Sequence, residues 1–150
     1  MSDTVLQIIP FLPEFTPSAE DAAAAESAVT RAFASADAVT RITSPSIVFR
    51  DAGANFESVS CPQCGSEVDQ EWWEQAMSAA AESDFEARGV VVPCCQAGTT
   101  LESLTYEWPQ GFSRFVIEVR NPGADAVPPA LRSALGPLLG GGIRIVWARY

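Results

Sequence analysis

The pattern of apolar and polar positions predicts short strands that alternate with helices. A β-branched apolar run over residues 4–9, closed by Pro10, indicates a buried strand. The stretch Thr16-Pro17-Ser18 is a typical helix start, and apolar residues then recur at helical spacing to about Ser35. Two further strands are expected over residues 46–51 and 56–60.

The second half of the chain continues this alternation. A helix is expected after residue 65, started by a capping box of Ser66 and Asp69 and with Trp72 on its inner side. A clear period-two pattern over residues 112–120 predicts a strand, because alternate side chains of a strand face opposite sides. The remaining expected elements are a short strand at 90–92, a helical turn at 101–104, a helix that Pro128 and Pro129 begin, and a last strand at 143–150.

The order of these elements predicts an α+β fold. Two strand–helix–strand units flank a cysteine-containing segment, and each unit resembles half of a ferredoxin-like sandwich. We therefore expect a mixed or antiparallel sheet with helices on one face. Residues 1–150 are expected to form a single domain, with a metal-binding module at about residues 56–98. The pattern leaves the strand order open.

Composition narrows the classes of protein. A hydrophobic fraction of 47%, with four Trp and eight Phe, is typical of a folded domain. The acidic N-terminus carries an apolar run, residues 5–9, that is too short for a signal peptide or a membrane span, so we expect a cytoplasmic protein without membrane association. The chain has no histidine and no lysine, which excludes His-dependent catalysis and Schiff-base chemistry. We expect no enzymatic activity.

Four cysteines form the pattern with the clearest chemistry. Cys61 and Cys64 lie in Cys-Pro-Gln-Cys-Gly, and Cys94 and Cys95 follow Pro93 about thirty residues later. A Cys-x-x-Cys turn directs two sulfurs at one centre, and zinc prefers four such ligands in a tetrahedron. The pattern predicts one structural Zn²⁺ per chain. Buried free thiols and a disulfide, including one between the adjacent cysteines, are the alternatives.

The first half of this pattern resembles the knuckle of a zinc ribbon, and the resemblance covers roughly residues 58–98. The second half departs from it, because a zinc ribbon repeats the Cys-x-x-Cys spacing whereas Cys94 and Cys95 are adjacent. Neighbouring residues of an extended strand point to opposite sides. Both cysteines reach one ion only if the backbone turns between them.

Charge decides between the two functional hypotheses. The net charge of −10 divides into −13 over residues 1–111 and +3 over residues 112–150. Negative potential around the cysteines should repel phosphates. The leading hypothesis is a non-enzymatic zinc-binding domain with a protein partner, such as an adaptor, an inhibitor or an immunity-like protein. The alternative is a nucleic-acid-binding zinc ribbon that uses the arginine-rich C-terminal part.

Candidate contact residues lie in two places. On the helix after the first knuckle, Glu71 and Glu74 belong to the outer side and Trp73 is the aromatic residue expected nearer the surface, although packing under the zinc loop is the more common role for such a residue. On the predicted sheet, Arg114 and Arg144, together with Arg149, could form an anion-binding row. Solvated strand faces with acidic cross-strand partners are the ordinary explanation of such arginines.

Overall fold

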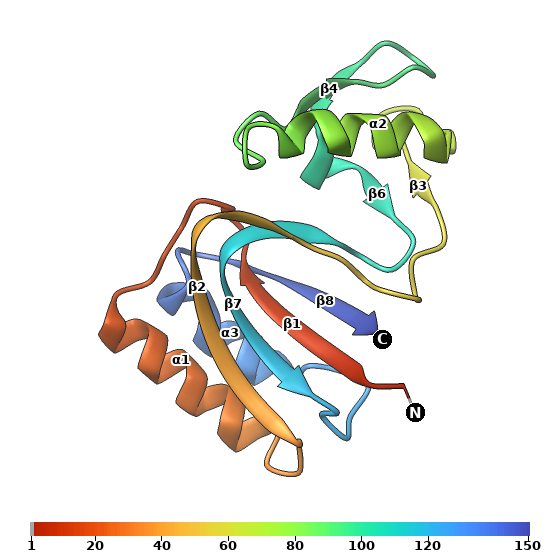
Figure 1. The fold of residues 1–150 in the computed structure, drawn as a ribbon. Helices are drawn as coiled ribbons and strands as arrows, with labels where there is room; N and C mark the ends of the chain where they lie inside the picture. Colours follow the sequence, from red (N-terminus) through yellow and green to blue (C-terminus); the bar gives the residue numbers. More distant parts are fainter. Residues whose placement is uncertain (1) are drawn as a thin grey trace.

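The computed structural model describes residues 2–150 and contains a four-stranded antiparallel sheet (Figure 1). The strand order is β2-β7-β1-β8, and neighbouring strands are antiparallel throughout. This confirms the expected α+β class and supplies the strand order. The bounds of the strands are β1 (Thr4–Pro10), β2 (Ala38–Arg50), β7 (Gly111–Arg120) and β8 (Ile143–Arg149).

Both outer helices, α1 (Ala19–Ala32) and α3 (Pro129–Leu138), cover the same face of the sheet (Figure 1). Because β1 and β2 are both antiparallel to β7, which lies between them, β1-α1-β2 and β7-α3-β8 are two interleaved split βαβ units. This is the topology of a ferredoxin-like sandwich. The core between helices and sheet includes Leu6, Ile8, Ala25, Val29, Phe115, Ile117, Val119, Leu131 and Leu135. The described helices all lack the combination of length and apolar character that a membrane crossing requires.

Strand β2 begins eight residues earlier than the sequence pattern indicates. The predicted strand covered residues 46–51, whereas the pairing with β7 already starts at Ala38. The first half of β2 lies at the edge of the sheet and is largely exposed, so its polar side chains hide the strand pattern. Its register shifts between Thr43 and Val48, around Pro45, and such an irregularity at an edge is where a sheet accepts proline.

Residues 51–110 form an insert between β2 and β7, which lies beyond one end of the sheet (Figure 1). This insert extends past the predicted module of residues 56–98 on both sides. Two small strand pairs and one long helix build it, and the predicted turn at 101–104 is a 3-10 helix, η1. The elements are β3 (Val59–Ser60) with β6 (Thr105–Tyr106), β4 (Gly89–Val91) with β5 (Gly98–Thr100), α2 (Gln70–Ala81) and η1 (Leu101–Ser103).

The insert has a core of its own that continues into the end of the main sheet. Trp73 lies at its centre, where its ring stacks on Phe56 at a centroid distance of 5.1 Å. Buried residues of β2 and β7, Ile47 and Phe112, belong to the same apolar cluster. The other buried members are Val59, Cys61, Val68, Ala80, Val92, Leu101, Leu104 and Tyr106. The insert is therefore packed onto the hairpin that carries it.

Helix α2 corrects two local predictions. Its N-cap is Asp69, whose side chain accepts a hydrogen bond from the backbone N–H of Glu71 at 3.0 Å. The capping box of Ser66 and Asp69 is therefore wrong, because Ser66 still belongs to the cysteine turn. The burial of the two tryptophans is the opposite of the prediction: Trp73 is 8% exposed, whereas Trp72 is only partly buried. The interpretation of Trp73 as an exposed contact is wrong, because the inner side of α2 is set by how it packs on Phe56 and Tyr106.

Candidate metal centre

Two six-residue turns, residues 61–66 and 92–97, bring the four cysteines together. Each turn is closed in the same way by its first and sixth residues. The N–H of Cys61 donates to the carbonyl of Ser66 at 2.9 Å, and the N–H of Val92 donates to the carbonyl of Ala97 at 3.0 Å. The first turn follows β3, and the second lies at the tip of the β4–β5 hairpin.

The fifth residues of the turns match as well. The N–H of Gly65 donates to the carbonyl of Cys61 at 3.0 Å, and the N–H of Gln96 donates to the carbonyl of Val92 at 3.0 Å. Both donors have a left-handed backbone, with φ of 76° at Gly65 and 61° at Gln96. Glycine adopts this conformation freely, and glutamine adopts it at some cost in strain. The second turn is thus a knuckle of the same shape as the first, which its sequence conceals.

Matching the turns position by position explains the adjacent cysteines. The fourth position holds Cys64 in one turn and Cys95 in the other. The first position holds Cys61 in one turn and Val92 in the other. The missing first-position cysteine is replaced by Cys94 at the third position. Because the turn reverses the backbone between positions three and four, neighbouring cysteines do not point to opposite sides here.

The four sulfur atoms all lie within 4.8 Å of one another. The sulfur of Cys61 is 3.8 Å from that of Cys95, and the sulfur of Cys64 is 3.3 Å from that of Cys94. A tetrahedron of thiolates at the Zn–S bond length has sulfur–sulfur edges of about 3.8 Å. The expected ligand cluster is confirmed as a group of four cysteines that can hold one metal ion.

Burial separates the four cysteines. Cys61 is 1% exposed and belongs to the apolar core of the insert, whereas Cys64, Cys94 and Cys95 are exposed. All four are free thiols. Three exposed thiols do not fit the alternative of cysteines that serve as buried apolar packing. The cluster is therefore attached to the core of the insert through Cys61, and its other three cysteines lie at the surface.

Hydrogen bonds within the first turn favour thiolates. The hydroxyl and the backbone N–H of Ser66 lower the pKa of Cys64 to about 6. The backbone N–H groups of Cys64 and Gln63 lower the pKa of Cys61, and the N–H of Gln63 lies 3.3 Å from the Cys61 sulfur. These donors stabilise negative charge on sulfur, which is the form that binds a metal.

The sulfurs of the first turn raise the pKa of both cysteines in the second turn. The nearby Cys64 sulfur raises the pKa of Cys94 to about 12. At Cys95 the N–H of Ala97 favours the thiolate, but partial loss of hydration and the sulfurs of Cys61 and Cys64 outweigh it and raise the pKa. Four thiolates so close together repel one another, and a bound cation removes this cost by supplying the opposite charge.

The other predicted contact residues are dispersed. Glu71 and Glu74 are exposed on α2, within the insert. The arginines lie on the main sheet, where Arg114 donates to the carbonyl of Ser44 at 3.1 Å and Arg144 donates to the carbonyl of Glu102 at 3.2 Å. Residues 144 and 149 of one strand face opposite sides of the sheet. The row that includes Arg149 is therefore wrong.

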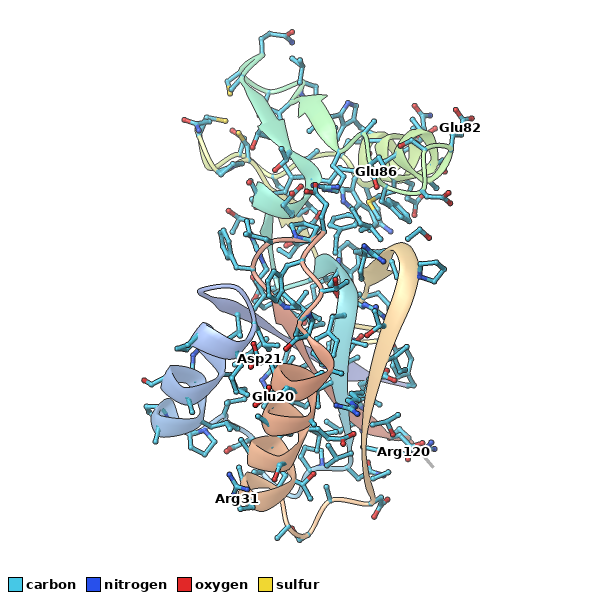
Figure 2. All side chains as sticks on the ribbon, turned by 90° about the vertical axis from the view of Figure 1, so that its left-hand side faces the viewer. Glu20, Asp21, Arg31, Glu82, Glu86 and Arg120 are labelled. Carbon is cyan, nitrogen blue, oxygen red and sulfur yellow. The ribbon has the colours of Figure 1, made fainter. Side chains whose placement is uncertain are left out.

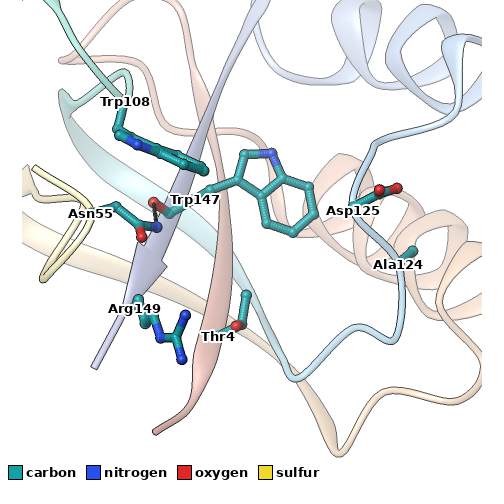
Figure 3. Close-up of a pocket in the computed structure, with 7 residues that line it drawn as sticks. All are labelled: Thr4, Asn55, Trp108, Ala124, Asp125, Trp147 and Arg149. Atoms are coloured by element: carbon teal, nitrogen blue, oxygen red, sulfur yellow. Dashed lines mark hydrogen bonds between the residues drawn. The ribbon is translucent and has the colours of Figure 1, made fainter.

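Two large apolar side chains of the insert are exposed and lie outside the predicted set of contact residues. Val91 is 56% exposed directly before the second turn, and Trp108 is 43% exposed in the last loop of the insert. Trp108 and Trp147 line a cavity of about 290 Å³ together with Asn55 and Asp125 (Figure 3). Trp108 has a φ of 65° and precedes a proline, which is a strained arrangement for a bulky residue. Its Trp-Pro dipeptide was the available signal, and it indicated only a loop.

No family model, no curated protein and no solved structure matches the chain.

Proposed function

We propose that the chain binds one structural Zn²⁺ through Cys61, Cys64, Cys94 and Cys95, and that it acts without catalysis, through contacts between its insert and a protein partner in the cytoplasm. The observation that carries this proposal is the convergence of four sulfurs, within 4.8 Å of one another, from two turns of the same shape. The resemblance of the first turn to a zinc-ribbon knuckle supports the same reading.

The ligand set favours zinc in a structural role. Four thiolates fill all positions of a tetrahedral ion and leave none for water or substrate, whereas catalytic zinc keeps one position open. Thiolate-only tetrahedral sites bind zinc or iron, and they disfavour magnesium and calcium. Of these two metals, zinc is the one without redox chemistry. It therefore suits a site in which three of the four ligands are exposed to solvent.

The metal would tie together two parts of the insert. One turn follows β3, which pairs with β6, and the other connects β4 to β5. These strand pairs are only two and three residues long, too short to hold their own geometry without packing or a cross-link. The ion would replace the missing length of strand and keep the insert folded on its aromatic core.

The outer side of α2 is the candidate partner surface. Glu71, Glu74 and Glu82 line a shallow groove on the solvent side of this helix. Figure 2 places Glu82 and Glu86 on the insert, above the helix layer that carries Glu20 and Asp21. A bound zinc tetrathiolate would add negative charge to the same insert. A partner with a basic surface fits this field, and the exposed Val91 offers an apolar contact beside the second turn.

The metal is tested on protein purified without added zinc. Elemental analysis for zinc and iron, with a native mass spectrum of the same sample, should give about one zinc per chain. Cys64→Ser should lose the ion, whereas Gln63→Ser, an exposed change in the same turn, should keep it. Four titratable thiols and no metal in the wild-type sample would contradict the zinc site.

The partner surface is tested with charge variants. Proteins captured by the tagged chain from a cell extract are compared between wild type and Glu71→Gln with Glu74→Gln. A control pair, Glu20→Gln with Asp125→Asn, makes the same change in net charge at exposed sites outside the insert. A specific partner should be lost with the α2 pair, should be retained with the control pair and should dissociate at raised salt. Equal capture by all three proteins would remove α2 from the interface.

A further inference from the structure

A second cavity, of about 290 Å³, lies at the edge of the main sheet, where β8 meets the last loop of the insert. Arg132, Arg144 and Gln110 line it on the polar side. Phe11 and Ile145 line it on the apolar side. The cavity shares no lining residue with the cysteine cluster.

Gln110 presents a buried donor without a partner. The residue is 3% exposed, and its Oε1 accepts a hydrogen bond from the backbone N–H of Ala52 at 2.8 Å. This bond orients the amide, so that Nε2 is the free end of the side chain. Among the described residues no atom accepts a hydrogen bond from Nε2. A buried polar atom without a partner costs free energy, and it commonly indicates a missing ligand or water.

Arg144 presents a second such donor. Its Nη1 donates to the carbonyl of Glu102 at 3.2 Å, while its buried Nε finds no acceptor within residues 2–150. The guanidinium lies over the ring of Phe11, with its central carbon 4.6 Å from the ring centroid. These contacts hold the group in place, so that the unused N–H edge is preorganised for an acceptor.

The edge of β8 adds backbone donors. The N–H of Arg149 donates to the carbonyl of Ala52, and the carbonyl of Arg149 accepts from the N–H of Ala54. The backbone N–H and C=O groups of Arg149 therefore point away from β1. Hydrogen-bonding directions alternate along a strand. Ile143 and Ile145 therefore also direct their N–H and C=O groups to the free edge, and both residues line the cavity.

The charge at the cavity is positive. Arg132 is exposed at its rim, and Arg144 forms part of its wall. The carboxylate of Glu102 acts on Arg144. Its Oε2 accepts a hydrogen bond from Arg88 at 3.1 Å, whereas its Oε1 is buried and has no hydrogen-bond partner among the described residues. Arg88 in turn contacts Glu14 at 3.7 Å. Burial lowers the pKa of Arg144, and the negative charge of Glu102 partly offsets this shift. The guanidinium remains protonated throughout the physiological range.

We infer that this cavity binds an organic carboxylate. The two carboxylate oxygens accept from Gln110 Nε2 and Arg144 Nε, and the rest of the ligand packs against Phe11 and the isoleucines of β8. An arginine edge beside an amide N–H matches a planar carboxylate. Inorganic phosphate carries more charge and no apolar part, so walls of Phe and Ile give it no compensation for lost hydration. The chemistry fits both a free organic acid and the C-terminal carboxylate of a peptide that extends along the edge of β8.

The test is a titration of ¹⁵N-labelled, metal-loaded protein, followed through the side-chain signals of Gln110 and Arg144. The probes are 3-phenylpropanoate, its neutral amide, inorganic phosphate and N-acetyl-Ala-Phe with a free C-terminus. The acid should shift both signals with a Kd on the order of 1 mM. The amide should bind about tenfold more weakly. A dipeptide that binds tenfold more tightly than the acid identifies a peptide terminus as the source, and equal binding identifies a free acid.

Variants separate this cavity from other sites. Arg144→Met and Gln110→Glu should each weaken binding at least about tenfold, and Arg132→Met, an exposed change, should weaken it several-fold. Arg31→Met removes the same charge from the helix layer (Figure 2) and should leave binding unchanged. The proposal is overturned if the acid shifts neither signal, or if the amide or phosphate binds as tightly as the acid. It is also overturned if only the indole signals of Trp108 and Trp147 respond.

Discussion

Val92 occupies in the second cysteine turn the position that Cys61 occupies in the first. Both backbone N–H groups donate to the carbonyl five residues later, and both side chains are buried, at 0% and 1% exposure. The buried first position thus holds a ligand in one turn and an apolar side chain in the other. Cys94, two positions further along, supplies the fourth sulfur from the exposed side.

This relationship predicts a rescue of metal binding. Cys94→Ser should weaken zinc binding roughly 100-fold or more, because four ligands share an apparent binding free energy of about 10–16 kcal/mol. Adding Val92→Cys should restore most of the affinity, since a cysteine at the first position completes the repeated spacing. Competition with a chromophoric chelator measures both effects.

The matched control is Val92→Ala combined with Cys94→Ser, which alters the same two positions without a new sulfur. This variant should bind zinc no better than Cys94→Ser alone. If Val92→Cys fails to restore binding while the protein stays folded, the two turns do not share one ligand geometry.

Removal of the metal should loosen the insert before the main sheet. A chelator, or the variant Cys64→Ser, should speed amide exchange in β3, β4, β5 and β6, because these short strands depend on the cross-link. The sheet of β1, β2, β7 and β8 has its own core with α1 and α3 and should stay protected. Uniform exchange across the whole chain, or no change at all, would contradict a local structural role.

Tyr106 should be important for the stability of the insert. Its hydroxyl donates to the carbonyl of Leu101 at 2.6 Å and accepts from the indole N–H of Trp73 at 3.2 Å. Tyr106→Phe would leave both partners buried and unsatisfied, at a cost of about 1–3 kcal/mol in the free energy of unfolding. Urea denaturation measures the change. The control Tyr150→Phe removes an exposed hydroxyl that donates to Asp51, and it should cost less than about 1 kcal/mol.

Asn121 combines a side-chain role with a backbone role. Its side chain accepts from the N–H of Thr4 at 3.0 Å and donates to Asp3 and Asp37, while its φ is 48°. Asn121→Gly removes only the side-chain bonds, whereas Asn121→Ala also adds strain of about 1 kcal/mol. We therefore expect the alanine variant to be the less stable of the two. Equal melting temperatures would show that the left-handed backbone is not maintained.

Nucleic acid binding separates the two functional hypotheses. Phosphate contacts are made by basic residues. The segment of the insert from Glu57 to Glu86 contains eight acidic residues and no basic one. We expect no binding to generic duplex or single-stranded nucleic acid tighter than about 10⁻⁴ M at physiological salt. An anisotropy titration measures it. Micromolar, salt-sensitive binding that is lost in Arg114→Ala with Arg144→Ala would favour the nucleic-acid alternative.

The regular elements with clear periodicity were predictable from local sequence. Phe115, Ile117 and Val119 alternate along β7 and all face the helix layer, and the predicted α1 is present, although it ends at Ala32. These predictions succeed because one buried face fixes the period of apolar residues. The first half of β2 was missed, because an exposed edge strand buries neither face well enough to leave that pattern.

The candidate site was predictable in its composition and not in its construction. Four cysteines in a chain without histidine already limited the ligands to thiolates, or thiolates with a carboxylate, since spacing and residue type are local properties. That Val92 stands at a ligand position depends on hydrogen bonds to Ala97 and on pairing between β4 and β5. Such contacts exist only in the folded chain.

The sequence by itself determined the α+β class, the order of the elements, the thiolate chemistry and the acidic charge of the cysteine segment. Tertiary structure decided which tryptophan of α2 is buried, how adjacent cysteines reach one centre, and that Gln110 and Arg144, 34 residues apart, line one cavity. The physical reason is the range of the interactions. Periodicity, capping and ligand type act over a few residues, whereas the burial of a side chain and the lining of a cavity result from the packing of segments distant in the chain.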